Sequence, residues 1–149
     1  MTTATLPHID RETLTPQLAK QLRPLIEANH AATGRAEPVS PEWPAIYEAE
    51  CHGALCLLVA RVDGLAVGYC AHAAIRNHGT GLLNAVCLAI YLDPSHRSLA
   101  RSLVARAEEY AKAAGCAAIS FHVPHMSRAG AFFEAIGYDC AELVMMRGL

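Results

Sequence analysis

The residues with the clearest potential for chemistry follow a long apolar run in the middle of the sequence. The run ends at Leu92, a turn containing Pro94 follows, and small and basic residues then open a predicted helix. The first turn of a helix carries backbone N–H groups without intrahelical partners, next to the positive end of the helix dipole. With a guanidinium nearby, such a turn can bind phosphate. The residues expected to do so are Arg97, Ser98, Leu99, Ala100, Arg101 and Ser102.

Two more polar residues are candidates for catalysis. His122 follows a short apolar run, and an imidazole with an ordinary pKa of about 6.5 suits proton transfer at neutral pH. Asn84 is the only clearly polar side chain before Tyr91 in the run 82–92. A structural hydrogen bond would explain either residue equally simply. Further candidates for a base are a bound water and the side chains of His72, His78, His125, Glu48 and Glu50.

A metal site is not expected from this sequence. His122 and His125 have a spacing seen in metal ligands, but Pro124 lies between them and no cysteine or carboxylate stands at a matching spacing. The six cysteines form no C-x-x-C pair, so we expect reduced, buried thiols without disulfides.

Composition narrows the class of protein. The 149 residues suit one domain spanning 1–149, and 53% hydrophobic with 17% charged residues excludes a disordered chain. A formal net charge of −2 gives no basic surface for nucleic acid. The run 82–92 is too short to span a bilayer, and the first ten residues lack the features of a signal peptide. We therefore expect a cytoplasmic protein with no nucleic-acid or membrane partner.

The pattern of apolar residues predicts a mixed α/β sheet with helices on its faces. Strands are expected within the first ten residues, as an edge strand, and over 54–62, 65–75, 82–92, 117–123 and 139–146. Asp63-Gly64 predicts a hairpin turn, and the almost wholly apolar run 82–92 predicts a central strand covered on both faces.

Helices are expected between these strands. One begins at Thr15-Pro16, with Pro24 predicted to kink or split it, and a second begins near Ser40 and ends at Gly53. The clearest amphipathic pattern covers 99–114, and a short helix covers 128–136. The connection from strand 82–92 through the long helix to strand 117–123 predicts a parallel pair.

Two segments resemble the GNAT superfamily of acetyl-CoA-dependent N-acetyltransferases. After its fourth strand this family has Arg or Gln, two residues, Gly, one residue, then Gly or Ala, and residues 97–102 are similar to that pattern. Residues 129–138, AGAFFEAIGY, are similar to the family's late helix, A-x-x-F-Y-E-x-x-G-F. The order of elements agrees over residues 14–146.

The resemblance implies a GNAT-like fold with two splayed parallel strands and acetyl-CoA between them. The pyrophosphate would lie on residues 97–102, and the pantetheine arm would pair with the backbone of Ile90, Tyr91 and Leu92. One amide of these three would face the thioester oxygen. A primary amine of a small molecule or a protein would attack the thioester directly. Many proteins of this fold form dimers, so a homodimer is expected.

The sequence departs from the family pattern at three places. Ala100 and Ser102 replace the glycines, which predicts weaker phosphate binding because side chains hold the phosphate further from the backbone. Phe133 stands where many members have a tyrosine that protonates the leaving thiolate. No carboxylate lies within 82–92. These departures favour, as the second hypothesis, a weakly active or inactive CoA-binding module.

The helices before residue 54 shape the acceptor side in this family. Glu42, Glu48 and Glu50 would then form a rim that favours cations, although an acidic helix face is usually only solvated. Trp43 and Tyr47, four residues apart, would line either the acceptor pocket or the core.

Overall fold

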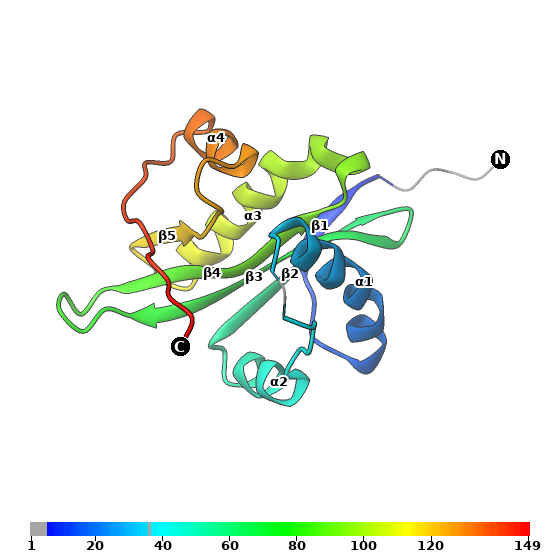
Figure 1. Ribbon diagram of the computed structural model, residues 1–149. Helices are drawn as coiled ribbons and strands as arrows, with labels where there is room; N and C mark the ends of the chain where they lie inside the picture. The colour runs from blue at the N-terminus through cyan, green and yellow to red at the C-terminus, as the bar shows by residue number, and fades with distance from the viewer. Residues whose placement is uncertain (1–5, 36) are drawn as a thin grey trace.

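The computed structural model describes residues 6–35 and 37–149, in which one mixed sheet lies between two layers of helices (Figure 1). The expected mixed α/β architecture is confirmed. The elements in chain order are β1 (His8–Arg11), α1 (Pro16–Ala32), α2 (Trp43–Cys51), β2 (Leu55–Val62), β3 (Leu65–Arg76), β4 (Leu83–Leu92), the 3-10 helix η1 (Pro94–Leu99), α3 (Ala100–Ala113), β5 (Ala118–Phe121) and α4 (Arg128–Ala135).

The strands lie in the order β1-β2-β3-β4-β5. The first four pair antiparallel and β4 pairs with β5 in parallel, as predicted for two strands joined by a long helix. The predicted β2–β3 hairpin turn is present, with φ of 49° at Asp63 and 80° at Gly64. Positive φ at both central residues is typical of a two-residue hairpin turn whose twist matches the twist of the two strands that it joins.

Two cores lie on the two faces of the sheet because side chains alternate along each strand. On β2, Leu57 and Val59 pack with α1, whereas Leu58 packs with Leu103 and Ala107 of α3. Helices α1 and α2 thus cover one face, and α3 covers the other.

Helix α1 begins at the predicted residues. The Thr15 hydroxyl accepts the Leu18 N–H at 3.1 Å, and Pro16 is the first helical residue. Of the two effects predicted for Pro24, a split of the helix is contradicted, since α1 continues to Ala32, and a kink stays a prediction. Pro24 lies on the exposed side of α1. Leu18 and Leu22, on the opposite side, are buried in the core, and their packing stabilises the helix.

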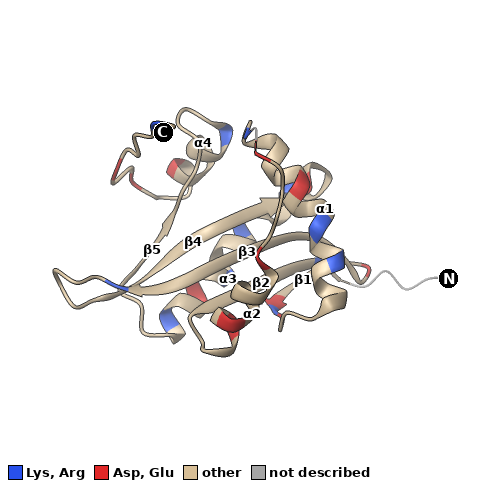
Figure 2. Ribbon diagram, turned by 60° about the horizontal axis from the view of Figure 1, so that its bottom comes forward, with Lys and Arg blue, Asp and Glu red and all other residues tan. Residues whose placement is uncertain are grey.

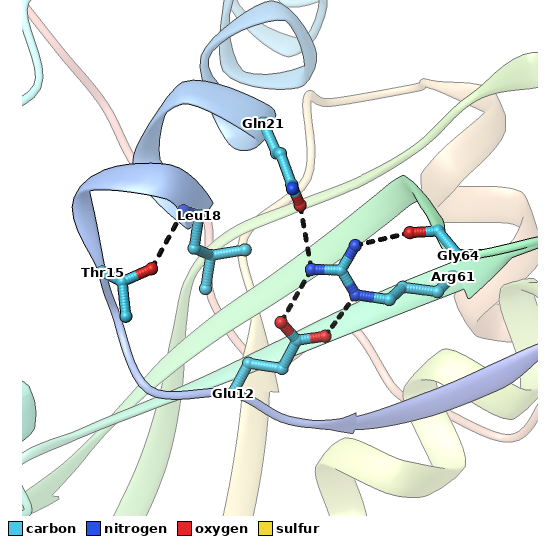
Figure 3. Close-up of polar contacts among 6 residues, drawn as sticks. All are labelled: Glu12, Thr15, Leu18, Gln21, Arg61 and Gly64. Atoms are coloured by element: carbon cyan, nitrogen blue, oxygen red, sulfur yellow. Dashed lines mark hydrogen bonds and ion pairs between the residues drawn. The ribbon is translucent and has the colours of Figure 1, made fainter.

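The Arg61 side chain near the end of β2 binds the segment between β1 and α1, helix α1 and the β2–β3 turn (Figure 3). The guanidinium of Arg61 donates from Nε to Glu12 Oε1 at 2.6 Å and from a terminal nitrogen to Glu12 Oε2 at 2.8 Å. It also donates to Gln21 Oε1 at 2.9 Å and to the Gly64 carbonyl at 2.8 Å. One side chain therefore joins the start of α1 to the β2–β3 turn.

The predicted last strand is absent. Residues 139–149 form no strand, and in Figure 1 the chain leaves α4 without joining the sheet. Tyr138 is held by its N–H to the Phe133 carbonyl at 3.0 Å, and the apolar side chains beyond it are exposed. Strand-forming side chains stabilise a strand only when a neighbouring strand supplies cross-strand partners, and this segment has none.

Two predictions about burial need correction. Strand β4 is covered on both faces over part of its length only, since Ala89 and Tyr91 pack in the core on the α1 side and Cys87 and Ile90 in the core on the α3 side, but Leu88 is 61% exposed. Among the cysteines, whose thiols are all free, Cys51 and Cys140 are exposed and not buried.

Charged residues lie mainly on helices and loops, while the strands are largely uncharged (Figure 2). Within the described part of the chain, no helix has the length and apolar character needed to cross a bilayer.

Candidate active site

Strand β4 carries a β-bulge at Leu88, and the bulge lies where β4 and β5 part. Ala71 pairs with Ala89 and His72 pairs with Cys87, so Leu88 has no partner on β3. The β4–β5 ladder ends at the pair Cys87–Phe121. A bulge bends its strand and increases the local twist, and Figure 2 shows β5 turning away from β4. Residues 88–92 therefore have one open edge, at the place where the family resemblance implied splayed strands.

The direction of the backbone groups on this open edge follows from one hydrogen bond. The Asp93 N–H donates to the Val67 carbonyl of β3 at 2.8 Å. Because alternate residues of an antiparallel strand point their polar groups to opposite sides, Tyr91 faces β3 while Ile90 and Leu92 face the open edge. Of the three residues predicted to pair with a pantetheine arm, only Ile90 and Leu92 offer free backbone groups there.

The turn after β4 uses its first two amides internally. Asp93 Oδ1 accepts the Ser95 N–H at 2.9 Å, and the Asp93 carbonyl accepts the His96 N–H at 2.8 Å. The Ser95 hydroxyl also donates to Asp93 Oδ1. These bonds from Ser95 lower the pKa of the Asp93 carboxyl, which is therefore held as an acceptor. The free donors expected just after Pro94 are thus displaced along the chain.

The first turn of α3 supplies them instead. Residues 94–99 form η1, and α3 begins at Ala100, whose N–H donates to the Arg97 carbonyl. The Ala100 amide, predicted to bind phosphate, is therefore already paired. Leu99 caps α3 without a side-chain hydrogen bond, so Arg101 and Ser102 carry first-turn amides with no α-helical partner.

The surroundings of these amides are positive and accessible. The side chains of Arg97, Ser98, Arg101 and Ser102 are exposed, whereas Leu99 and Ala100 are half-buried. Neither arginine forms an ion pair with any residue in 6–35 or 37–149. Partial burial raises the pKa of the Tyr91 hydroxyl, and the Arg97 charge opposes this shift. Arg97 thus lies close to the end of β4.

His122 stands beside the point where the strands part. It is the first residue after β5, whose last residue Phe121 closes the ladder with Cys87, and it is exposed. A group at this position can reach a reactant between the diverging strands. His125 follows in the loop before α4.

Asn84 lies at the other end of the ladder. It pairs with Ile75 and Ala118 near the start of β4 and β5. Four residues separate Asn84 from Leu88, which is about 13 Å along a strand. The structure therefore does not bring Asn84 together with His122 or with the open edge of β4.

Most of the other candidate bases also lie elsewhere. His72 is buried on the α3 side of the sheet, and His78 lies in the loop between β3 and β4. Glu50 is buried and its Oε2 accepts the Leu14 N–H at 2.8 Å, so it forms no solvated acidic rim.

The two aromatic residues of α2 have different surroundings. Trp43 packs against the α1 core, and Tyr47 is half-exposed.

In the described ranges no three His, Cys, Asp or Glu side chains could hold a metal ion.

The residue at the expected tyrosine position is part of the core. The Phe133 ring stacks on Phe121 with centroids 4.6 Å apart and is buried. The nearby Tyr138 hydroxyl donates to Glu108 Oε1 at 2.6 Å, and its burial and this carboxylate raise the pKa of the phenol. Neither residue supplies an uncommitted hydroxyl to protonate a thiolate.

Comparison with protein families matches residues 21–138 to the family model described as Acetyltransferase (GNAT) family. No curated protein sequence matches this chain.

Solved structures share the fold over nearly the whole chain. A transcriptional regulator from Bacillus halodurans C-125 has a TM-score of 0.78 and 19% identity, covering 95% of this chain and 100% of that one. A ribosomal-protein-alanine N-acetyltransferase from Brucella melitensis biovar Abortus 2308 has a TM-score of 0.74 and 23% identity, covering 97% of this chain and 100% of that one. The aminoglycoside acetyltransferase AAC(6')-Iy, in complex with the bisubstrate analogue CoA-S-monomethyl-acetylneamine, has a TM-score of 0.71 and 19% identity. The match covers 95% of this chain and 98% of that one.

Proposed function

Since the chain belongs to the acetyltransferase (GNAT) family, we propose that it transfers an acetyl group from acetyl-CoA to a primary amine of a small molecule or a protein. The observation that carries this proposal is the open edge of β4 over residues 88–92, which leads directly to the first-turn amides of α3 that have no α-helical partner. An extended chain of amides and a diphosphate are the two parts of CoA that such a pair of features would bind.

In this proposal the backbone of Ile90 and Leu92 pairs with the pantetheine arm. The amides of Arg101 and Ser102 bind the pyrophosphate, and the guanidinium of Arg97 neutralises part of its charge. The Ser98 hydroxyl and the small side chain of Ala100 let the diphosphate approach the turn. Acetyl-CoA supplies the activated thioester.

His122 accepts the proton in the proposed reaction. The amine nitrogen attacks the thioester carbonyl carbon, a new C–N bond forms, and the C–S bond breaks with the electron pair leaving on sulfur. An amide of Ile90 or Leu92 stabilises the carbonyl oxygen as charge develops on it. His122 takes the proton lost by the amine, directly or through a water. With no free tyrosine hydroxyl, the thiol is protonated from solvent.

The names of the structural neighbours support an amine as acceptor. One is a ribosomal-protein-alanine N-acetyltransferase and another an aminoglycoside N-acetyltransferase, so both a protein and a small molecule fit. Because the proposed cosubstrate is a cytoplasmic metabolite, we place the protein in the cytoplasm.

We extend the proposal to a homodimer formed through the C-terminal segment. Strand β5 lies at the edge of the sheet and residues 139–149 are unpaired. Their exposed apolar side chains are Leu143, Val144, Met145, Met146 and Leu149. Sedimentation should show a dimer for the full chain and a monomer after Leu143→Ser with Met145→Ser; a monomer in both cases would contradict the dimer.

A CoA-binding module without turnover is the second candidate. It is favoured by Phe133, which has no proton to give, and by the Ala100 amide, which is already paired.

Two measurements separate the candidates. Thiol release from acetyl-CoA, measured with a panel of primary amines, reports turnover, and the shift in unfolding temperature with CoA reports binding. The proposed enzyme shows both. Binding without turnover for every amine supports the module, and no shift with CoA contradicts both functions.

A further inference from the structure

One end of the sheet is covered by helices on one face only. The core under α1 and α2 extends to Ala71 on β3 and to Ala89 on β4. Beyond these two residues β3, β4 and β5 remain paired, and in Figure 1 this end of the sheet extends past α1 and α2. On the other face of β4, Ala85 and Cys87 are buried, and Cys87 packs with Leu103 of α3. The α1 side of this end is therefore the side open to solvent.

Six residues from three strands form this uncovered face. Ala71 packs on the α1 side and side chains alternate along a strand, so Ala73 and Ile75 point to the same side. Residues directly opposite one another in a sheet share a face, so the register adds their partners on β4 and, in turn, the partners of those on β5. All six are half-buried or exposed, and they are Ala73, Ile75, Asn84, Val86, Ala118 and Ser120.

The uncovered face adjoins the proposed reaction site. His122 lies two residues after Ser120, and the exposed Leu88 lies two residues after Val86. Ala118, at the far end of the face, is four residues before His122, which is about 13 Å along a strand. An amine held at His122 therefore has the length of this face available for the rest of its molecule.

The uncovered face carries no formal charge. Four of its side chains are apolar, and the other two are the Asn84 amide and the Ser120 hydroxyl. Neither of these polar groups forms a hydrogen bond with residues 6–35 or 37–149. A second ammonium or a carboxylate lying here would lose water without gaining a counter-ion, whereas an apolar chain would gain by leaving water. The face thus complements an uncharged, apolar molecule with a hydrogen-bonding group.

The C-terminal segment leaves the uncovered face accessible. Residues 139–149 cross in front of this end of the sheet in Figure 1, but Leu143 is 67% exposed and Met145 is 90% exposed. Side chains packed on the face would be largely buried. A small molecule can therefore reach the face in this structure.

Resting on the proposed acetyl transfer, we infer that the uncovered face binds the body of the acceptor and selects its class. The acceptor is a primary amine with an uncharged, mainly apolar body and a hydroxyl or amide group at its far end. Its amine lies at His122, its apolar body lies on Val86 and Ile75, and its far group bonds to the Asn84 amide. Asn84 therefore determines specificity at a distance from the reacting atoms.

Four amines of equal length test the class of acceptor. Octylamine, aminooctanol, diaminooctane and aminooctanoate carry a primary amine at one end of an eight-carbon chain and differ only at the other end. Thiol release from acetyl-CoA gives kcat/KM for each amine. We expect the values for octylamine and aminooctanol to exceed those for diaminooctane and aminooctanoate by about tenfold or more, which corresponds to about 1.4 kcal/mol. Aminooctanol should have the highest value.

Variants connect this preference with the face. Ser120→Asp adds a carboxylate at an exposed position, so kcat/KM for diaminooctane relative to octylamine should rise about tenfold or more. Leu65→Asp places the same charge at the exposed first residue of β3 and should leave this ratio unchanged. Asn84→Val should remove the advantage of aminooctanol over octylamine.

Three results would overturn the inference. Equal kcat/KM values for the four amines would show that the acceptor does not touch this face, as when the C-terminal segment or a second copy of the chain covers it. A preference for diaminooctane or aminooctanoate would assign a charged acceptor. An unchanged ratio in Ser120→Asp would place the body of the acceptor elsewhere.

The wild-type measurements separate this inference from the proposed function. They decide the first two results, so the test stands even if a variant does not fold. Thiol release with other amines but with none of these four contradicts the inference alone. No thiol release with any amine contradicts the proposed acetyl transfer as well.

Discussion

Gly68 of β3 lies directly opposite Leu92 at the end of β4, and it leaves no room for a side chain. A Cβ on Gly68 would come within 2.6 Å of Leu92 Cδ1 and 2.8 Å of the Tyr91 carbonyl oxygen. Strand β4 can therefore lie close to β3 just before Asp93, where its other edge is open.

Gly68→Ala tests this close approach. Because a backbone oxygen cannot move without the strand, we expect the free energy of unfolding to fall by about 1–3 kcal/mol. The KM for acetyl-CoA should rise as well. Gly79→Ala is the matched control, since its Cβ would meet only the Asn77 side chain at 3.4 Å. Chemical denaturation and steady-state kinetics measure both effects, and equal behaviour of the two variants would contradict the prediction.

Ala100→Glu tests the start of α3 as a diphosphate site. A carboxylate there adds bulk and like charge beside the proposed pyrophosphate, so the CoA-induced rise in unfolding temperature should disappear. Ala113→Glu places the same change at the exposed last residue of α3 and should keep the full rise. A full response in Ala100→Glu means that CoA binds elsewhere.

His122→Gln tests the proposed base. We expect kcat to fall by about 10²–10⁴-fold with little change in CoA affinity, because general base catalysis contributes about that much. His78→Gln, in the loop between β3 and β4, is the control and should leave kcat unchanged. An undiminished kcat in His122→Gln would assign proton removal to another group or to water.

The stability of the protein should depend on pH through His72. Burial and the Arg11 charge lower the pKa of this imidazole below its ordinary value of 6.5. The unfolded chain then binds the proton more readily, so the contribution of His72 is present above about pH 6.5 and is lost as the pH falls through the lowered pKa. Thermal unfolding between pH 5 and pH 8, at about half-unit steps, should show a shallower slope in His72→Gln. An unchanged slope would rule out His72 as its source.

The Glu12–Arg61 ion pair should contribute measurably to stability. The guanidinium of Arg61 donates to both carboxylate oxygens of Glu12, and the Arg61 side chain is only 14% exposed. We therefore expect Arg61→Leu to lower the free energy of unfolding by about 1–3 kcal/mol. Arg23→Leu removes an exposed pair with Glu27 within α1 and should cost about 0.5 kcal/mol or less. If the two variants differ in unfolding free energy by less than about 0.5 kcal/mol, the Glu12–Arg61 pair adds nothing beyond a surface contact.

Local signals in the sequence determined most elements. Thr15 and Pro16 start α1, and Asp63-Gly64 forms the hairpin, because these residues set the backbone of their own neighbourhood. The family resemblance over residues 97–102 rests on similarly local features.

Only the tertiary structure decided which residues lie opposite one another in the sheet. The bulge at Leu88 depends on the register of β4 against β3, which no periodicity within β4 reveals. That register determines that Ile90 and Leu92 face the open edge and Tyr91 does not, and it places Asn84 too far from His122 to act with it.

Burial without a partner was likewise invisible in the sequence. His72 and Glu50 stand among ordinary strand and helix residues, and only the packing of the folded chain leaves His72 Nδ1 and Glu50 Oε1 without a hydrogen-bond partner among the described residues. The pattern over residues 139–146 predicted a strand, yet a strand also needs a neighbour across the sheet. The sequence by itself therefore determined the local conformations, while the tertiary structure decided which groups are paired and which remain open, because pairing depends on residues far apart in the chain.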